Sequence, residues 1–587
     1  MSNPFDQGAG FLPVDTLDHE IFTPEQFSEE QRMFAQATTE FMERSVVPHR
    51  EQIEGKDLEL LRKLMGEAGE MGLLGIEIPE RFGGLGLDLT TACVVAEYIA
   101  LDANFATTHL AHTGIGTLPI VFFGNEETQS MILPKSASGE WIGAYCLTEP
   151  GSGSDALAAR TQALSVDGGF AVSGNKQFIT NGGFADYFTV FAQVNPEQAE
   201  GGRNFTGFVA LRSGGGIEPQ AEEHKMGVRG SSTTPVRFEE CFIPGAQQLG
   251  EEGKGHRIAF GILNIGRLKL GAASVGGAKI ALGGALKYVK ERKQFGRAIA
   301  DFRLTKHKIG TLAADLYAAE SILYRCSGDI DRAIHSLDSS APDFAEKKIK
   351  AIEEFALECA VNKVFASEML SRTVDECVQL HGGYGFIAEY PAEAAYRDSR
   401  INRIWEGTNE VNRMLIPGTL MRRAMRGKLM SVMAFQQKVT QGLASGELDL
   451  PDYQGEAAPA LRIGAQLRRL CIFVSGMAAA KFERKIVREQ VALTACADLM
   501  IMAYTVDAAA RRAAQSGNAL QCQLANLHAA MTIDAARSLS NRTLKDIGAR
   551  EGMTMIQPLL DDGELNLTAL AYEVSLPLLE AGEYQLG

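Results

Sequence analysis

Short strand-like segments are confined to one stretch of this 587-residue chain, and this confinement limits the fold class. The segments are rich in aromatic and β-branched residues and are bounded by Gly, Asn or Pro, as strands commonly are. They are Trp141–Thr148, Phe170–Val172, Gln177–Thr180, Tyr187–Gln193, Asn204–Leu211 and Val236–Phe242. The flanking sequence has helical periodicity, so strands do not alternate with helices. A doubly wound parallel sheet is therefore excluded.

Helical periodicity is predicted to begin at Thr23. The segment Thr23-Pro24-Glu25-Gln26 offers an N-cap, a first-turn proline and a glutamine whose side chain can reach back to the backbone N–H of the cap. Long helical stretches resume after the strands, and the Gly/Ser/Asp/Pro-rich segment 442–455 is typical of a linker. We therefore predict a mainly α fold with a central β-domain, a barrel or sandwich. The predicted parts are an N-terminal helical domain (1–140), the β-domain (141–253), a helical bundle with the catalytic base (254–425), a linker or amphipathic segment (426–456) and a C-terminal helical domain (457–587).

Composition excludes several classes of function. The chain has 57 basic and 73 acidic residues, a net charge of −16, which argues against a general nucleic-acid binder. Its nine cysteines form no CxxC pair, so we expect buried thiols in a reducing compartment and no metal site. We find no apolar run of membrane-spanning length, and the first thirty residues are acidic, unlike a targeting peptide. Cytoplasmic localisation is the resulting expectation.

Two polar loops follow predicted strands. In Tyr145–Asp155, Gly151 and Gly153 allow the backbone to approach a ligand closely, and neighbouring hydroxyls suit a flat heteroaromatic ring or a phosphate. Gln177–Gly183 is the second loop, with Asn-Gly chemistry that also fits an ordinary hairpin. Each loop taken alone is more often just a turn.

Two predicted helix ends and one carboxylate complete the candidate set. Glu291–Gly296 ends a helix, where its basic pair serves either as a C-cap or as a guanidinium contact to a diphosphate. Gln379–Gly385 also closes a helix, and a histidine such as His381 is more often a capping or core residue than a catalyst. Glu406 lies between Trp405, which would desolvate its carboxylate, and Gly407, which leaves room for a substrate. Desolvation raises the pKa of a carboxyl group and makes it a better base, although most glutamates are simply solvated.

Taken together and in order, five segments resemble the acyl-CoA dehydrogenase family of flavoproteins. They are CLTEPGSGSD (146–155), KQFITNGG (176–183), ERKQFG (291–296), QLHGGYG (379–385) and EGTNE (406–410). The resemblance covers about residues 30–420 and is nearest to the very-long-chain branch, which also carries a helical extension. It implies a helical N-terminal domain, a central β-domain and a four-helix bundle.

The resemblance implies FAD as the cofactor and a homodimer. It places Tyr145, Leu147, Thr148, Gly153, Ser154, Phe178 and Thr180 around the flavin ring and its near phosphate. Residues implied to reach the FAD of the neighbouring subunit are Arg292, Gln294, Gln379, Gly382 and Gly383. Thr408 and Glu410 are implied to close over the ADP part.

The resemblance also implies the reaction. Glu406 would remove a proton from the carbon next to a thioester carbonyl while hydride leaves the adjacent carbon for the flavin, giving a trans-2-enoyl-CoA. Electrons would then pass to an electron-transfer flavoprotein. Ser154, Asn264, Arg267 and Gly407 match substrate-contacting positions, and the small residues Thr107 and Ala111 predict a deep acyl pocket. Because each buried CH₂ adds about 0.8 kcal/mol, we expect a preference for chains of about C14 and longer.

Two other functions stay open at this point: an acyl-CoA oxidase that uses oxygen, and a flavin-binding stress or assembly protein of the same fold. The acidic charge argues against the second, whose relatives tend to be basic. Met421–Gly446 has five basic residues, no acidic residue and a Met-rich apolar stripe. It is predicted either to contact the inner face of the membrane peripherally or to pack inside the protein.

Overall fold

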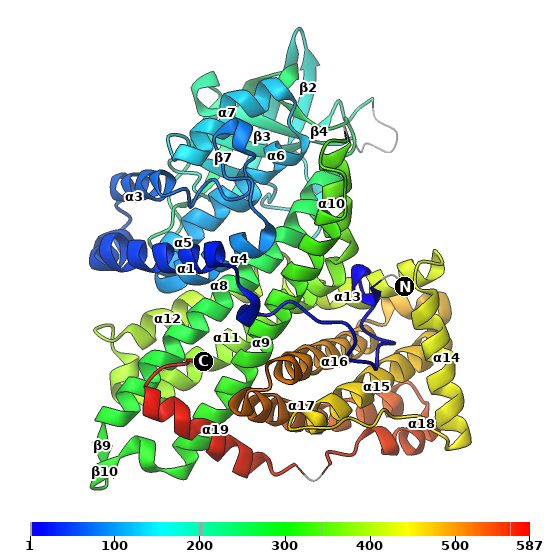
Figure 1. The fold of residues 1–587 in the computed structure, drawn as a ribbon. Coiled ribbons are helices and arrows are strands. Elements are labelled where there is room, and N and C mark those ends of the chain that lie inside the picture. The colour runs from blue at the N-terminus through cyan, green and yellow to red at the C-terminus, as the bar shows by residue number, and fades with distance from the viewer. Residues whose placement is uncertain (1–2, 199–203, 342, 564, 587) are drawn as a thin grey trace. The chain divides into compact units, whose positions relative to one another are not determined.

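The computed structural model describes residues 3–198, 204–341, 343–563 and 565–586 (Figure 1). Contacts divide the chain into two compact units. The sheet unit comprises Ser28–Gly276 and Ile334–Glu353, and the bundle unit comprises Met1–Phe27, Gly277–Ala333 and Glu354–Gly587. The long helix α8 (Gly255–Glu291) begins in the sheet unit and ends in the bundle unit. The five-part division predicted from sequence remains a prediction.

The described part of the sheet unit contains an eight-stranded sheet, ordered β6-β7-β3-β2-β4-β5-β8, with β1 paired to β4. The strands are β1 (Gly143–Cys146), β2 (Gln162–Val166), β3 (Gly169–Thr180), β4 (Tyr187–Val194), β5 (Phe205–Leu211), β6 (Ile217–Pro219), β7 (Thr233–Pro244) and β8 (Gln248–Leu249). Pairing is parallel where β4 meets β1 and β2, and antiparallel elsewhere. Apolar side chains such as Val172, Phe188 and Phe208 are fully buried against one another. The predicted central β-domain is confirmed.

Helices make up the rest of the sheet unit: α1 (Glu29–Phe41), α2 (Arg50–Glu54), α3 (Leu58–Glu70), α4 (Leu89–Tyr98), α5 (Ala103–Leu110), α6 (Leu118–Phe123), α7 (Glu126–Ser138) and α10 (Phe344–Glu354). The first α-helix begins later than predicted. Thr23 and Gln26 do form a reciprocal cap, with Gln26 Oε1 accepting from the Thr23 N–H at 3.0 Å, but it serves only the short 3₁₀ turn Pro24–Gln26. Ser28 caps α1 instead: its Oγ accepts from the Gln31 N–H at 3.1 Å.

In its described residues, the bundle unit has helices and one small hairpin, β9–β10 (Lys293–Gln294 and Arg297–Ala298). Its helices after α8 are α9 (Arg303–His335), α11 (Ala356–His381), α12 (Pro391–Ser399), α13 (Asn409–Met425), α14 (Met430–Ser445), α15 (Ala458–Phe482), α16 (Gln490–Ser516), α17 (Ala519–Asp546), α18 (Arg550–Met555) and α19 (Leu567–Ala581). In the C-terminal extension α15, α16 and α17 pack on one another, and α16 also packs on α13.

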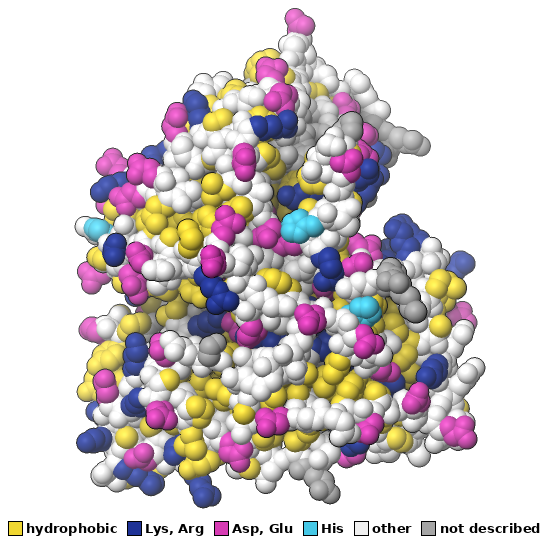
Figure 2. Space-filling model, in the orientation of Figure 1, with side chains coloured by type: hydrophobic (Ala, Val, Ile, Leu, Met, Phe, Trp, Pro, Cys, Tyr) yellow, Lys and Arg dark blue, Asp and Glu magenta, His cyan; other side chains and the backbone are white. Residues whose placement is uncertain are grey.

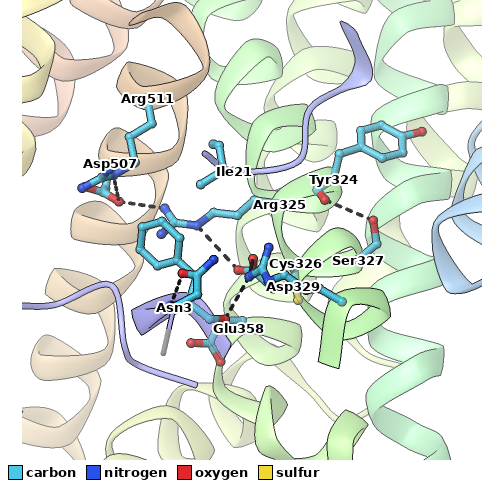
Figure 3. A network of polar contacts seen from close by, with 12 residues as sticks. Asn3, Ile21, Tyr324, Arg325, Cys326, Ser327, Asp329, Glu358, Asp507 and Arg511 are labelled. Carbon is cyan, nitrogen blue, oxygen red and sulfur yellow. Dashed lines mark hydrogen bonds and ion pairs between the residues drawn. The ribbon is translucent and has the colours of Figure 1, made fainter. Parts of the chain in front are cut away.

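Buried ion pairs tie the N-terminal segment to this extension. Asp507 on α16 accepts from Arg325 Nη1 at 2.7 Å and from Arg511 Nε at 3.1 Å (Figure 3). Asp507 also pairs with Arg468. In the N-terminal segment, Asp15 binds Arg468 and Arg469 at 2.7 Å each, and Glu25 binds Arg512 at 2.7 Å. Because an unpaired buried charge is costly, each of these arginines depends on its carboxylate.

On the face shown in Figure 2, acidic and basic side chains are interspersed, so the charge of −16 is not gathered there into one patch. All nine cysteines are reduced and buried, as the sequence predicts. Two described helices, α8 and α16, are long and apolar enough to cross a membrane by length and composition, which differs from the sequence expectation. The structure buries 78% and 72% of their apolar windows, and buried core helices pass the same test, so this is weak evidence for a span.

Candidate functional site

The two polar loops predicted from sequence lie next to each other in the sheet unit. The first follows β1 and the second ends β3, and the Gln177 N–H donates to Thr148 O at 2.9 Å. Tyr145 and Leu147 are buried at the start of the first loop, whereas Gly153 and Ser154 are exposed at its tip. The structure therefore brings the predicted flavin residues of both loops together.

A buried ion pair holds the first loop in place. Lys176, which is fully buried on β3, donates to Glu149 Oε1 at 2.8 Å and to Phe191 O at 2.7 Å. Glu149 also accepts from the backbone N–H groups of Arg160 and Thr161 at 2.6 and 3.0 Å. Burial alone raises the pKa of Glu149, but the charge of Lys176 and these hydrogen bonds outweigh it and lower the pKa. Glu149 is thus a charged anchor within the loop.

Features of both loops fit a flat ligand. Phe178 has a φ of 57°, which is unfavourable for an aromatic residue, and 62% of its side chain is exposed. Strained residues of this kind gather at ligand-binding positions. A Cβ atom added to Gly151 or Gly153 would meet nothing within 4 Å, so packing within the chain does not require these glycines. The residues present therefore fit an aromatic cofactor such as FAD.

The predicted substrate residues of the sheet unit lie on α8 and α5. Asn264 and Arg267 are buried one turn apart on α8, and Arg267 Nη1 donates to Asn264 Oδ1 at 2.9 Å. Thr107 is half-buried on α5, and Ala111 is buried where that helix continues as a π-helical turn. The unit also contains a small cavity, which His109, Leu110, Thr113 and Lys269 help to line. Thr107 and Ala111 are not among its lining residues, so their role in chain length stays a prediction.

In the bundle unit, the two predicted helix ends are also neighbours. Arg292 follows α8 and lies over the ring of Tyr384 at 5.3 Å, in the turn that follows α11. The other predicted residues of these two helix ends are exposed: Gln294, Gln379, Gly382 and Gly383. A Cβ atom added to either glycine would meet nothing within 4 Å. His381 is the last residue of α11: its Nδ1 lies 2.7 Å from Cys377 O, and its ring stacks on Tyr288 with centroids 4.2 Å apart, which fits the simpler structural interpretation.

The Glu406 loop lies between the 3₁₀ turn Arg400–Arg403 and α13 in the bundle unit. Glu406 has a φ of 55° and Gly407 a φ of 82°, so two consecutive residues are left-handed. Thr408 caps α13, because its Oγ1 accepts from the Val411 N–H at 3.3 Å, and Glu410 is exposed in the first turn. Such a sharp turn before a helix presents the Glu406 side chain and its N–H in a fixed direction.

Sequence reasoning missed the residues that hold these loops. Lys176 and Lys363 are both fully buried, and each donates to a backbone carbonyl of a candidate loop, Leu147 O for Lys176 and Gly407 O for Lys363. Lysine is almost never fully buried, so its identity alone carries no such signal. The candidate residues are divided between the two units, and the structure describes each group within its own unit. Among the described residues, no group of three or more His, Cys, Asp or Glu could hold a metal ion.

Comparison with known proteins supports the assignment suggested by these loops. Models of the acyl-CoA dehydrogenase N-terminal, middle and C-terminal domains match residues 28–140, 144–241 and 253–421, and a further C-terminal domain model matches 466–556. A "probable acyl-CoA dehydrogenase" of Bacillus subtilis is 42% identical over 86% of this chain and 84% of its own length. The human mitochondrial very long-chain specific acyl-CoA dehydrogenase is 34% identical over 68% of this chain and 60% of its own length.

The solved structures agree. A crystal structure of an acyl-CoA dehydrogenase complexed with FAD, from Bacillus anthracis, is 38% identical, has a TM-score of 0.94, and covers 99% of this chain and 100% of that one. The matched domains follow one another along the chain as a helical, a β-sheet and a second helical domain. This order is that of a class of oxidoreductases. The chain belongs to the acyl-CoA dehydrogenase family, and the resemblance to its very-long-chain branch is confirmed.

Proposed function

We propose that the chain is an FAD-dependent acyl-CoA dehydrogenase that converts a long-chain acyl-CoA to the trans-2-enoyl-CoA, the first step of fatty acid β-oxidation. The single observation that carries this proposal is Glu406, held left-handed beside Gly407 in a family whose relatives are named acyl-CoA dehydrogenases. FAD, when bound, accepts the hydride. The proposed holders of its flavin ring are Tyr145, Leu147, Thr148, Gly153, Ser154, Phe178 and Thr180.

Glu406 is the proposed base. Its carboxylate takes the proton from the carbon next to the thioester carbonyl, and its backbone N–H donates to the carbonyl oxygen, where negative charge develops. Such a preorganised donor is worth about 10²–10³ in rate. Asn264 and Arg267 on α8 are proposed to contact the acyl-CoA. Ser154, which lies in the first polar loop, and Gly407, which lies in the Glu406 loop, are also proposed substrate contacts.

Five further FAD contacts are proposed to involve a second subunit: Arg292, Gln294, Gln379, Gly382 and Gly383 are assigned to the partner's FAD. Thr408 and Glu410 are proposed to close over the ADP part of FAD. The exposed aromatic side chains Phe295 and Phe386, at 93% and 83%, support a homodimer, because large apolar side chains this exposed favour an interface. We propose an electron-transfer flavoprotein as the electron acceptor.

Anaerobic titration of the flavin-loaded protein with acyl-CoAs of graded length tests the function. Bleaching of the flavin absorbance by long acyl-CoAs, with slow oxygen consumption in air, supports a dehydrogenase. Rapid oxygen consumption with peroxide formation supports the acyl-CoA oxidase instead. Flavin that no acyl-CoA bleaches would contradict both enzymes and favour the stress or assembly protein.

Replacing Ala111 by glutamate is expected to shift the chain-length preference toward shorter acyl-CoAs. If this position lines the acyl pocket, the added side chain removes space for the end of a long chain, at about 0.8 kcal/mol per displaced CH₂. Reduction rates across C4 to C18 acyl-CoAs measure the shift. Ala111→Leu is the matched control for volume without charge, and both variants are checked by thermal melting. A profile identical to that of the parent would contradict the assignment of Ala111.

We also propose a cytoplasmic protein that touches the inner face of the membrane at the break between α13 and α14. The predicted apolar residues are divided here: Leu429, Val432 and Phe435 are buried, whereas Met425 and Met433 are 87% and 43% exposed. The neighbouring Met430 is 67% exposed. Part of the basic charge is already engaged, since Arg423 pairs with Glu354 and Lys438 with Asp449. Arg426 and Lys428 lie beside the exposed methionines.

Co-sedimentation with vesicles tests this contact. We expect binding to anionic but not neutral vesicles, weakening with salt, because each basic residue near such a surface adds about 1 kcal/mol. Replacing Arg426 and Lys428 together by glutamine is expected to weaken binding, whereas Lys438→Gln is the matched control. If the parent protein stays in the supernatant at low salt, the membrane contact is wrong and the segment only packs the extension.

A further inference from the structure

A buried ammonium group lies behind the loop that carries Glu406. Lys363 on α11 is 0% exposed, and its Nζ donates to Gly407 O at 2.8 Å and to Asn409 Oδ1 at 2.6 Å. A buried cation loses its hydration, so it needs hydrogen-bond acceptors in its place. Within this unit the carbonyl of the residue directly after Glu406 supplies one of them.

A second donor contacts the same loop from a residue that follows the loop in sequence. The side-chain amide of Asn412, also 0% exposed, lies 2.8 Å from Gly407 O, 3.1 Å from Thr408 O and 3.4 Å from Glu406 O. Three consecutive carbonyls therefore converge on two donors, and Gly407 O accepts from both. Thr408 O also accepts from the backbone N–H of Asn412 at 3.0 Å, so the side-chain donors matter most at Gly407 O, which accepts from both of them.

This convergence explains a strained backbone. A left-handed glutamate is uncommon and persists only where its surroundings fix it. The φ of Glu406 determines where both its carboxylate and its N–H point. The donors that hold the carbonyls of Glu406 and Gly407 therefore also hold the two groups that the proposed reaction uses.

The lysine is itself held by a chain of polar contacts. Asn409 presents its oxygen to Lys363 because its Nδ2 donates to Glu368 Oε1 at 2.9 Å. Glu368 is fixed by a two-bond pair with Arg413 at 2.7 and 3.0 Å. Arg413 in turn donates to Asp498 of α16 at 2.7 Å. The C-terminal extension thus contributes to the position of Lys363 through side chains of the same unit.

We propose that Lys363 is a positioning residue for Glu406: its ammonium group fixes the Gly407 carbonyl and thereby the left-handed conformation that aims the base. The proposal rests on the proposed function, in which Glu406 abstracts the proton. It predicts that loss of Lys363 slows proton abstraction without a comparable loss of FAD or acyl-CoA binding.

The test measures anaerobic flavin reduction of the FAD-loaded Lys363→Met variant by rapid mixing with a long-chain acyl-CoA. We expect the maximal rate to fall about 10–100-fold, because small misplacements of a reacting group are this costly. The half-saturating acyl-CoA concentration should change by less than about threefold, and deuterium at carbon 2 should slow the variant more than the parent. Lys363→Gln, which keeps a donor, should recover part of the rate. Lys279→Met is the matched control, because Lys279 pairs with Glu320 on α9 of the same unit.

Each outcome decides the inference. A reduction rate within about threefold of the parent for Lys363→Met, with Glu406→Gln inactive, would overturn it and leave the proposed function intact. If Glu406→Gln also reduces normally, the proposed role of Glu406 as the base fails instead, whereas a parent flavin that no acyl-CoA bleaches would contradict the proposed function itself. Loss of FAD without a larger isotope effect would show a merely structural role. Should Lys363→Met not fold, Lys363→Gln and Asn412→Ala are measured in its place, and unchanged reduction in both overturns the proposal.

Discussion

Replacing Glu406 by glutamine is expected to abolish flavin reduction by acyl-CoA while leaving the bound cofactor in place. The amide is almost isosteric with the carboxylate, so the left-handed loop and its contacts to Asn412 should survive. It cannot accept a proton, and loss of a general base costs at least about 10²–10⁴ in rate. The measurement is the anaerobic bleaching rate after rapid mixing with a long-chain acyl-CoA.

Two controls separate this effect from a general loss of structure. Glu447→Gln changes an exposed glutamate that follows α14 and should reduce at the parent rate. The flavin absorbance and the acyl-CoA affinity of Glu406→Gln should match those of the parent. A Glu406→Gln protein that bleaches within a few-fold of the parent rate would remove Glu406 from the mechanism.

The largest expected effect on stability comes from Asp507→Asn. Asp507 pairs with Arg325, Arg468 and Arg511, and all four side chains are buried. Removing one partner from a buried ion pair leaves uncompensated charge and costs about 3–5 kcal/mol. We expect the melting temperature of the bundle unit to fall on the order of 10 °C. Asp449→Asn is the matched control, because the exposed pair of Asp449 with Lys438 contributes at most about 1 kcal/mol.

The same carboxylate predicts a direction for acid sensitivity. Burial alone raises the pKa of Asp507, but the charges of Arg511, Arg468 and Arg325 outweigh burial and hold the pKa well below its ordinary value. A carboxyl group with a lowered folded-state pKa contributes stability above its unfolded pKa and loses it as the pH falls. The parent should therefore lose stability below about pH 4, whereas Asp507→Asn should lose less over that range. Equal acid sensitivity of the two proteins would contradict this role.

The fold was predictable where side-chain patterns are strong. The strands with continuous apolar burial, β4 and β5, lie where aromatic and β-branched residues cluster. β2 was missed because its apolar residues, Ala163, Leu164 and Val166, do not alternate with polar ones, and only Ala163 is buried. The start of α1 was misplaced because two capping boxes lie five residues apart, at Thr23 and Ser28, and local sequence does not decide between them.

The loops of the candidate site were predictable from the sequence, but the buried side chains that hold these loops were not. Gly, Asn and an isolated Glu between Trp and Gly are visible in the sequence, and the structure gives Phe178 and Glu406 unusual backbone conformations. Lys176 and Lys363 could not be identified, because their importance lies in which carbonyls they meet across the fold. Those partners are separated from them in sequence, and no local pattern encodes such a contact.

The arginines that bind the N-terminal segment also determine when its ion pairs can form during synthesis on the ribosome. Asp15 meets Arg468 across 453 residues, and Glu25 meets Arg512 across 487. At about 5–20 residues per second, the segment emerges roughly 20–90 s before the first of these partners is made. Its carboxylates keep it hydrated during that interval, and the ion pairs of Asp15 and Glu25 can form only after α15 and α16 have been made. Two helices of the C-terminal extension, made late in synthesis, therefore fix residues near the start of the chain.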